Sequence, residues 1–288
     1  MPETTLVNLE GVSETLLIPL YIRAKETQRA DAMLRDETAV QMVGHIDYDF
    51  SRIKLMEHDM LGVVLRVREF DRFTRDFMAG HRDPAVVHIG CGLDTRFERV
   101  DDGRVEWYDL DLPDVIDLRR KLIREEGKRH HLLSGSVFDF AWLEAVKENR
   151  QRPFLFMAEG VFPYFEEAQI KSFVSRAQKE FPGAELVFDA HTPFVIWADN
   201  LQLAFSKVSA RMKFALKHGR DVETWGDPST SASTSSARRL GAGGIRMLEE
   251  WFYFGADEPR VRPYRWMRRI PLMGKSTGIF HYRLGNSH

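Results

Sequence analysis

The sequence contains little cysteine and no long hydrophobic run. Cys91 is the single cysteine among 288 residues, so an internal disulfide framework is excluded, and the chain suits a reducing compartment. No C-x-x-C or histidine spacing accompanies Cys91, and we expect no metal site. No charged-then-apolar segment opens the chain, and no uninterrupted apolar run reaches the roughly 18 residues of a membrane helix. These absences predict a cytoplasmic protein that is neither secreted nor membrane-spanning.

An excess of charge of one sign is also absent. The 41 basic and 43 acidic residues are interspersed, and they leave a net charge of -2 and a pI near 6.6. Because no large positive field arises, we expect neither nucleic acid nor membrane as a partner. The one basic cluster with aromatic residues, at 260–269, is interpreted as a solvated face. Since 43% of the residues are hydrophobic, the chain can bury a large core.

A short apolar run that breaks into two glycines lies at residues 85–96, AVVHIGCGLDTR. This pattern predicts a buried parallel strand that ends in a tight turn. Gly90 can adopt backbone angles that a side chain would penalise, and Gly92 lets the main chain approach a ligand closely. We interpret the turn as the cradle of a nucleotide-like ligand. The alternative is a plain strand–turn–helix corner, which uses the same residue types.

Acidic residues at the end of the next apolar segment, residues 105–113, support a nucleoside ligand. Asp109 and Asp111 follow the glycines by about 20 residues, where α/β nucleoside-binding domains place the carboxylate that accepts the ribose hydroxyls. By spacing alone, either could do so. Thr95 replaces the third glycine of a dinucleotide fingerprint, which argues against NAD, and Arg96 suits a ligand carboxylate. A ligand with a ribose at one end and a carboxylate at the other is S-adenosylmethionine.

Apolar runs and helical periodicities alternate after residue 85, which predicts a parallel sheet covered by helices on both faces and closed by an antiparallel edge hairpin. Residues 14–80 show helical spacing, and residues 1–80 are expected to form a helical N-terminal cap over one end of the site. Residues 81–288 would form a Rossmann-like domain with lid helices at about 192–250 and a mobile Ser-rich loop at 229–236. The expected strands lie at 85–90, 105–110, 131–137, 153–158, 184–189, 251–254 and 277–284, and the expected helices at 114–126, 140–149 and 166–181.

Four blocks of the sequence, HIGCGLDTR, WYDLDLP, MAEGVFPYF and LYIRAKETQRADAMLRD, resemble the leucine carboxyl methyltransferase family, and within it the bacterial branch of polyketide O-methyltransferases. The resemblance covers roughly residues 15–195. It implies an α/β fold of the class I S-adenosylmethionine-dependent methyltransferases, in which a Rossmann-like seven-stranded sheet carries a helical N-terminal cap and a lid insertion.

The implied activity is S-adenosylmethionine-dependent O-methylation of a small-molecule acceptor. The acceptor would be a carboxylate or a hydroxyl of an aromatic or polyketide-like metabolite. Two alternatives stay open, namely a protein carboxyl methyltransferase that modifies the C-terminus of a partner and a non-catalytic module that binds S-adenosylmethionine.

The resemblance also implies which residues hold the methionine portion of the cofactor. A basic residue in the N-terminal block holds the carboxylate in the family; Lys25 matches it by spacing, and Arg23 is the alternative. Arg96 would pair with the same carboxylate. Gly90 and Gly92 would pass beneath the methionine and ribose.

For the remainder of the cofactor, the resemblance favours Asp111 as the acceptor of the ribose hydroxyls, because it precedes an x-Pro as the acid of the family does. Family members usually place an acidic and then an apolar residue against the adenine, and this chain has Ser136 and Val137, with Asp139 as a compensating carboxylate. Glu159 matches the acid beside the cofactor amino group, where it would make a charge-assisted hydrogen bond.

Residues for the methyl acceptor are the least constrained by the sequence. Methyl transfer from a sulfonium is an in-line displacement that needs no metal and no covalent intermediate. A carboxylate acceptor is already ionised at neutral pH, whereas a phenol would benefit from a base. Tyr164 and His191 follow the fourth and fifth expected strands, and they are the catalytic candidates.

Overall fold

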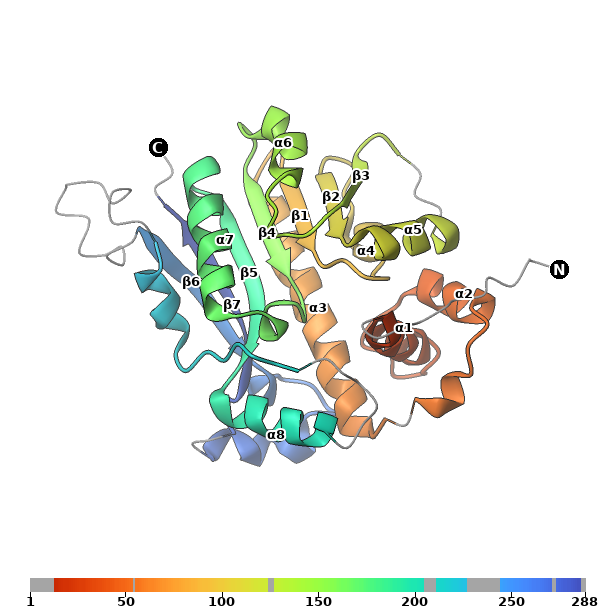
Figure 1. Cartoon of the computed structure of the whole chain (residues 1–288). Helices are drawn as coiled ribbons and strands as arrows, with labels where there is room; N and C mark the ends of the chain where they lie inside the picture. Colours follow the sequence, from red (N-terminus) through yellow and green to blue (C-terminus); the bar gives the residue numbers. More distant parts are fainter. Residues whose placement is uncertain are drawn as a thin grey trace.

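The computed structural model describes residues 13–53, 55–123, 127–204, 211–226, 244–270 and 273–285. Its centre is a seven-stranded sheet with the strand order β3-β2-β1-β4-β5-β7-β6 (Figure 1). The strands are β1 (Ala85–Ile89), β2 (Glu106–Asp111), β3 (His130–Ser134), β4 (Phe154–Ala158), β5 (Glu185–His191), β6 (Ile245–Phe252) and β7 (Thr277–Leu284).

The first five strands run parallel, and β7 runs antiparallel to both of its neighbours. The predicted seven-stranded α/β sheet with an antiparallel edge hairpin is thereby confirmed. Every residue of β1 and of β4 is buried, as expected for parallel strands that are covered on both faces and therefore have continuous apolar sequences. The carboxyl ends of five strands consequently meet at one edge of the sheet.

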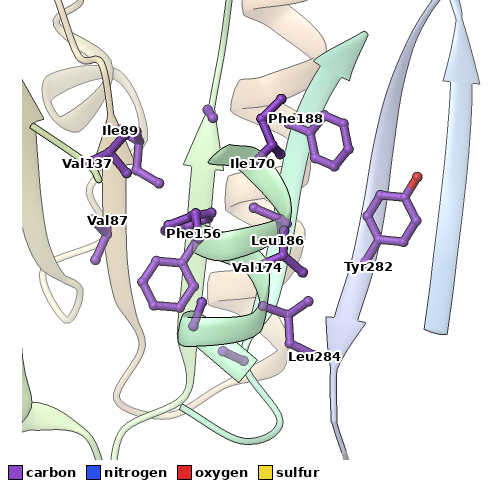
Figure 2. Close-up of a cluster of buried hydrophobic side chains, with 14 of the residues drawn as sticks. Val87, Ile89, Val137, Phe156, Ile170, Val174, Leu186, Phe188, Tyr282 and Leu284 are labelled. Atoms are coloured by element: carbon purple, nitrogen blue, oxygen red, sulfur yellow. The ribbon is translucent and has the colours of Figure 1, made fainter. Parts of the chain in front are cut away.

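One face of the sheet packs against α7 (Glu167–Glu180) and α6 (Trp142–Val146). Figure 2 shows Ile170 and Val174 of α7 against Phe156 and Leu186 of the sheet. Ile170 and Val174 are four residues apart and thus share one side of the helix. This layer forms the largest part of the core.

The other face packs against α3 (Glu57–Gly80) through Phe70, Phe73 and Phe77, which contact strand residues such as Val86. Residues 57–80 were expected in the N-terminal cap, but they form a layer of the sheet domain because their aromatic stripe covers the strands. The domain boundary predicted after residue 80 therefore falls inside a single packed unit.

Among the described residues of the expected cap, α1 (Ser13–Thr27) and α2 (Glu37–His45) are the helices that lie where a cap would lie. Their apolar residues pack against the glycine turn at Leu93 and against Ile123. Asp36 caps α2 by accepting the Ala39 N–H at 2.9 Å, which satisfies a donor that the first helical turn leaves free. In Figure 1, α1 and α8 (Pro193–Ala204) lie towards the end to which the β4 arrow points.

The expected lid region contains α8, an extended segment at 211–217 and a 3-10 helix at Gly219–Thr224. The expectation of lid helices up to residue 250 was wrong at its end, because β6 begins at Ile245 and pairs with β7. As an edge strand with one wet face, β6 carries charges that hide its strand pattern. The expected Ser-rich loop at 229–236 lies outside the described residues. The remaining helices are α4 (Arg96–Val100), α5 (Pro113–Leu122) and short 3-10 turns, among them Phe162–Tyr164, Tyr253–Gly255 and Arg262–Arg269.

Candidate functional site

A cavity of about 580 Å³ lies at the carboxyl ends of the parallel strands. Its walls come from α1, α3, the glycine turn, the residues after β2, β3 and β4, the end of β5 and the segment 211–213. The cavity sits between β1 and β4, where the strand order reverses, which is the usual ligand position in open α/β sheets. Its volume falls in the usual range of small-molecule sites.

The glycine turn forms the floor of this cavity. Gly90 and Gly92 have φ angles of 64° and 51°, in the left-handed region that side chains disfavour. A Cβ atom on Gly90 would lie 2.4 Å from Val161 Cγ2. Both predicted glycines line the cavity, and neither position tolerates a side chain without displacement of its neighbours.

The carboxylate of Asp111 faces the cavity beside this turn. One oxygen accepts the Gly92 N–H at 2.8 Å, and the other accepts the Leu112 N–H at 2.7 Å. Burial raises the pKa of Asp111. Each oxygen keeps acceptor capacity for a ligand hydroxyl.

Asp109, the alternative by spacing, is not part of the cavity wall. It accepts hydrogen bonds from Trp107 at 2.8 Å and from Arg119 at 2.6 Å beneath the sheet edge. Burial alone would raise its pKa, but Arg119 and His130 hold the pKa far below its usual range. Asp109 thus has a structural ion pair, and Asp111 alone of the two presents oxygens to the site.

Arg96 is wholly buried and does not reach the cavity wall. Its guanidinium donates to Asp71 Oδ1 at 2.6 Å and to Glu159 Oε2 at 2.5 Å, and it lies 3.2 Å from Asp94 Oδ2. The prediction that Arg96 binds the cofactor carboxylate was therefore wrong, because three protein carboxylates already surround it.

The N-terminal basic residue at the cavity is Arg23, not Lys25. Lys25 is exposed, with its ammonium 5.0 Å from the Tyr21 ring centre. Arg23 is buried, lines the cavity, and donates to Asp36 Oδ2 at 2.8 Å and to the Leu93 carbonyl at 2.7 Å. Residues two positions apart in a helix point about 200° apart around its axis, so only one of these two side chains can face the site.

Ser136 and Val137 lie on the cavity wall after β3, as predicted. The Ser136 hydroxyl accepts the Phe138 N–H at 3.3 Å. Asp139 does not compensate for a missing acid here, because it is exposed and accepts the Ala141 N–H at 2.8 Å.

Glu159 lines the cavity together with a residue that sequence reasoning missed, Arg66 of α3. Arg66 Nε donates to Glu159 Oε1 at 3.0 Å, and Nη1 donates to Asp189 Oδ2 at 3.3 Å. Burial would lower the pKa of Arg66, but these two carboxylates raise it. A signal existed in the sequence: Arg66 stands on the same helical stripe as Phe70 and Phe73, where a charge is unusual.

Tyr164 and His191 both line the cavity, and both interact electrostatically with Arg66 and Asp189. His191 Nδ1 lies 3.0 Å from Thr277 Oγ1. Burial lowers the pKa of His191, although Asp189 opposes the shift, and the imidazole is therefore neutral at physiological pH. Burial raises the pKa of Tyr164, which keeps its phenol protonated.

The segment 211–217, which lies within the expected lid region, crosses these two residues. The Lys213 N–H donates to the Pro163 carbonyl at 2.7 Å, and the Leu216 N–H donates to the His191 carbonyl at 2.9 Å. Arg211, Met212 and Lys213 consequently line the cavity beside Tyr164 and His191.

Within the described ranges, no group of three or more His, Cys, Asp and Glu side chains could hold a metal ion. Over the same part of the chain, no helix combines the length and hydropathy needed to span a membrane.

The strand order, the left-handed glycine turn and the carboxylate at the end of β2 define a class I S-adenosylmethionine-dependent methyltransferase. A family model described as leucine carboxyl methyltransferase matches residues 17–178. The chain belongs to the leucine carboxyl methyltransferase family.

Two relatives agree with this assignment. TcmP of Streptomyces glaucescens, a tetracenomycin polyketide synthesis O-methyltransferase, is 40% identical over 285 residues, which cover 96% of this chain and 98% of TcmP. The S-adenosyl-L-methionine-dependent methyltransferase dpfgK of Gibberella zeae is 34% identical over 202 residues, or 64% of this chain and 67% of dpfgK. The chain is accordingly an S-adenosylmethionine-dependent O-methyltransferase, and S-adenosylmethionine is its cofactor.

A solved structure shares the fold. The crystal structure of a protein from Thermobifida fusca, assigned as a methyltransferase, superposes with a TM-score of 0.52 at 14% identity and covers 92% of this chain and 94% of the other. At this identity the likeness concerns the fold alone.

The cavity wall fits S-adenosylmethionine. The glycine floor admits a ligand where the Cβ of a side chain would collide with Val161. Asp111 offers carboxylate oxygens for ribose hydroxyls, and Glu159 and Arg66 offer opposite charges for an amino acid. The wall therefore offers polar partners for two parts of the cofactor, the ribose and the amino acid.

Proposed function

We propose that this enzyme methylates an oxygen of a small, aromatic, polyketide-like acceptor. The observation that carries the proposal is the 40% identity with TcmP, which extends over 96% of the chain and therefore includes the residues around the acceptor part of the cavity. The wall there is mainly apolar and aromatic, with Pro163, Tyr164, Phe165 and Met212. Such a wall suits a flat aromatic molecule.

For the cofactor, we assign the ribose hydroxyls to Asp111 and the adenine to the wall at Ser136 and Val137. The methionine carboxylate would bind Arg66, whose two ion pairs are made through Nε and Nη1, and Arg23 adds positive charge at the same end. Glu159 would accept the cofactor ammonium, since an ionised carboxylate makes the stronger hydrogen bond with a cation.

S-adenosylmethionine supplies a methyl group on a positively charged sulfur, which an acceptor oxygen displaces in line. The part of the protein is to hold that oxygen in line and to exclude water. Residues 211–213 line the cavity beside Tyr164, and the segment 211–217 to which they belong is fixed to Pro163 and His191 by backbone hydrogen bonds. We infer that this segment and α8 act as the lid, and that α1 and α2 act as the cap.

His191 is the proposed base for a phenolic acceptor. When Nδ1 carries the proton and donates to Thr277 Oγ1, Nε2 is free to accept a proton. The lowered pKa of His191 keeps this nitrogen unprotonated. Tyr164, with a raised pKa, would orient the acceptor through its protonated hydroxyl rather than act as the base.

The acceptor is proposed to carry an acidic group. Arg211 and Lys213 line the acceptor part of the cavity. Lys213 pairs with Glu166 at 3.2 Å, whereas within the described residues Arg211 has no carboxylate partner. An anionic group on the acceptor would complete that pair.

The cellular setting remains a proposal. Cys91 is the single cysteine and is buried, so no disulfide forms within the chain, which suits a reducing cytoplasm. The balanced charge favours a small molecule over nucleic acid as partner.

Incubation of the enzyme with S-adenosylmethionine and a panel of aromatic carboxylic acids and phenols tests the proposal. We expect S-adenosylhomocysteine to accumulate with a methylated acceptor, both detected by mass spectrometry, and the Asp111→Ala variant to be inactive. A peptide with a free C-terminus serves as the competing acceptor. Turnover of the peptide together with inactivity on the whole aromatic panel would overturn the proposal.

A further inference from the structure

Asp189 is a fully buried carboxylate that the mechanism above does not use. It lies on β5 with Glu185 and Val187 on the sheet face that packs against α3, because alternate strand residues share a face. A buried carboxylate costs stability unless partners compensate it, and an apolar residue of similar volume often serves the fold as well. The position of the partners of Asp189 therefore indicates whether this carboxylate serves the site as well as the fold.

The two oxygens of Asp189 bind two different parts of the cavity wall. Oδ1 accepts the Gly160 N–H at 2.6 Å, and Oδ2 accepts Arg66 Nη1 at 3.3 Å. Gly160 has a φ of 68°, and a Cβ there would lie 3.3 Å from Arg66 Nη2. The turn after β4 thus passes directly against the guanidinium.

These contacts close a ring around the charged end of the site. Arg66 binds Asp189 through Nη1 and Glu159 through Nε, and Glu159 precedes the Gly160 that Asp189 also binds. Tyr253 also interacts with the Arg66 guanidinium, and burial raises the pKa of this tyrosine. A rigid guanidinium fork held at two points is a preorganised carboxylate ligand.

We propose that Asp189 is a positioning residue that fixes Arg66 and the Glu159–Gly160 turn in the orientation that binds the amino-acid portion of the cofactor. The inference rests on the carboxylate-binding role proposed above for Arg66. It assigns to Asp189 no contact with the cofactor. We expect its effect on cofactor binding to pass through Arg66 and Gly160, the two cavity residues that it hydrogen-bonds.

Asp189→Asn separates the two contacts, because the amide oxygen can still accept the Gly160 N–H while the charge opposite Arg66 is lost. We expect the variant to bind S-adenosylhomocysteine about tenfold more weakly in calorimetric titrations, in line with the loss of one charged hydrogen bond. Asp189→Ala, which loses both contacts, should weaken binding by up to about 100-fold.

Glu185→Gln is the matched control. Glu185 is a buried carboxylate on the same strand and face, but it pairs with His281 at 2.7 Å and with Arg283 at 2.8 Å, away from the cavity. Both variants should lower the urea midpoint of unfolding, and only Asp189→Asn should lower the affinity for S-adenosylhomocysteine. Equal affinities of the two variants would overturn the proposal.

A double-mutant cycle with Arg66→Gln tests whether Asp189 acts through Arg66. In the Arg66→Gln background, Asp189→Asn should change the affinity little further, whereas additive losses would contradict the inference. If Arg66→Gln alone leaves the affinity unchanged, the role proposed for Arg66 fails. If it weakens binding but Asp189→Asn does not, only the present inference fails.

Should Asp189→Asn prove too unstable to purify, Arg66→Lys addresses the same bridge. A lysine keeps a charge opposite Asp189 but cannot bind two carboxylates in the planar fork. An affinity between those of the wild type and Arg66→Gln would support the proposal, and wild-type affinity would contradict it.

Discussion

The two ends of the cavity differ in how their charges are held. At the cofactor end, Arg23 and Arg66 each pair with protein carboxylates, and the network behind them is buried. At the acceptor end, Arg211 is exposed and, in the described part of the chain, has no carboxylate partner. The helix α8 nearby exposes the large apolar residues Phe194, Trp197 and Leu201.

This contrast follows from what each end must recognise. The cofactor does not vary, so its end can be built on strands and helices and fixed by ion pairs. The acceptor end lies on segments that can change without disturbing the core. The motif Asp94-Thr95-Arg96 belongs to the fixed end: Thr95 Oγ1 donates to Asp36 at 2.7 Å, which ties the glycine turn to the start of α2.

The largest effect expected is on stability, from Arg96→Leu. The substitution would leave Asp71, Asp94 and Glu159 without their shared cation in a buried site, which costs about 3–5 kcal/mol. Urea unfolding of this variant should show a loss of that size, or no folded protein. Arg211→Gln, at the exposed end, should change the free energy of unfolding by no more than about 0.5 kcal/mol. Equal stabilities would mean that the two ends do not differ as described.

Arg96 also shows where sequence reasoning reaches its limit. Its partners Asp71 and Glu159 lie 25 and 63 residues away, and only the packing of α3 and β4 brings them together. Gly90, Gly92 and Asp111 could be predicted, because their roles depend on one turn and the adjacent strand. Lys25 failed for a different reason: the stretch is helical as predicted, but its rotation is set by packing against Leu93 and α3.

The fold was more predictable than the site for a related reason. The buried strands β1 and β4 are continuous apolar runs bounded by turns. Each predicted strand differs from the observed one by a single residue at one end. The edge strand β6 has charged residues such as Glu249 and Glu250, and its start was missed. Arg211 lies on an extended segment whose position depends on hydrogen bonds to Pro163 and His191 rather than on periodicity.

His191→Gln should produce the largest effect on catalysis. For a phenolic acceptor we expect kcat to fall by about 10²- to 10⁴-fold, the usual contribution of a general base, with unchanged affinity for S-adenosylhomocysteine. Because burial lowers the pKa of His191 below its usual value of 6.5, the wild-type rate should fall only as the pH drops below that value. A variant that retained this acid limb in its pH–rate profile would contradict the assignment. For a carboxylate acceptor the loss should be much smaller, since no proton has to be removed.

Asp111→Ala tests the cofactor end directly. Loss of the carboxylate should weaken binding of S-adenosylhomocysteine by about 10- to 100-fold, as expected for charged hydrogen bonds. Asp139→Ala, which removes an exposed carboxylate outside the cavity, is the control and should bind normally in the same calorimetric titration. A similar decrease in both variants would indicate a general effect of negative charge rather than contact with the ribose.

The smallest effect, and the one that best sharpens the contrast, is expected from Arg211→Gln. The KM for an acidic aromatic acceptor should rise by about tenfold, because one charged hydrogen bond is lost at an exposed rim, while the KM for its neutral methyl ester should not change. Affinity for S-adenosylhomocysteine should also stay constant, since Arg211 lies at the acceptor end with Tyr164 and His191. Equal changes in KM for the acid and the ester would show that Arg211 contributes to the shape of the rim but does not recognise the charge of the acceptor. Selectivity for acids would then have to come from the buried cations, and the fixed end of the cavity would take part in choosing the acceptor.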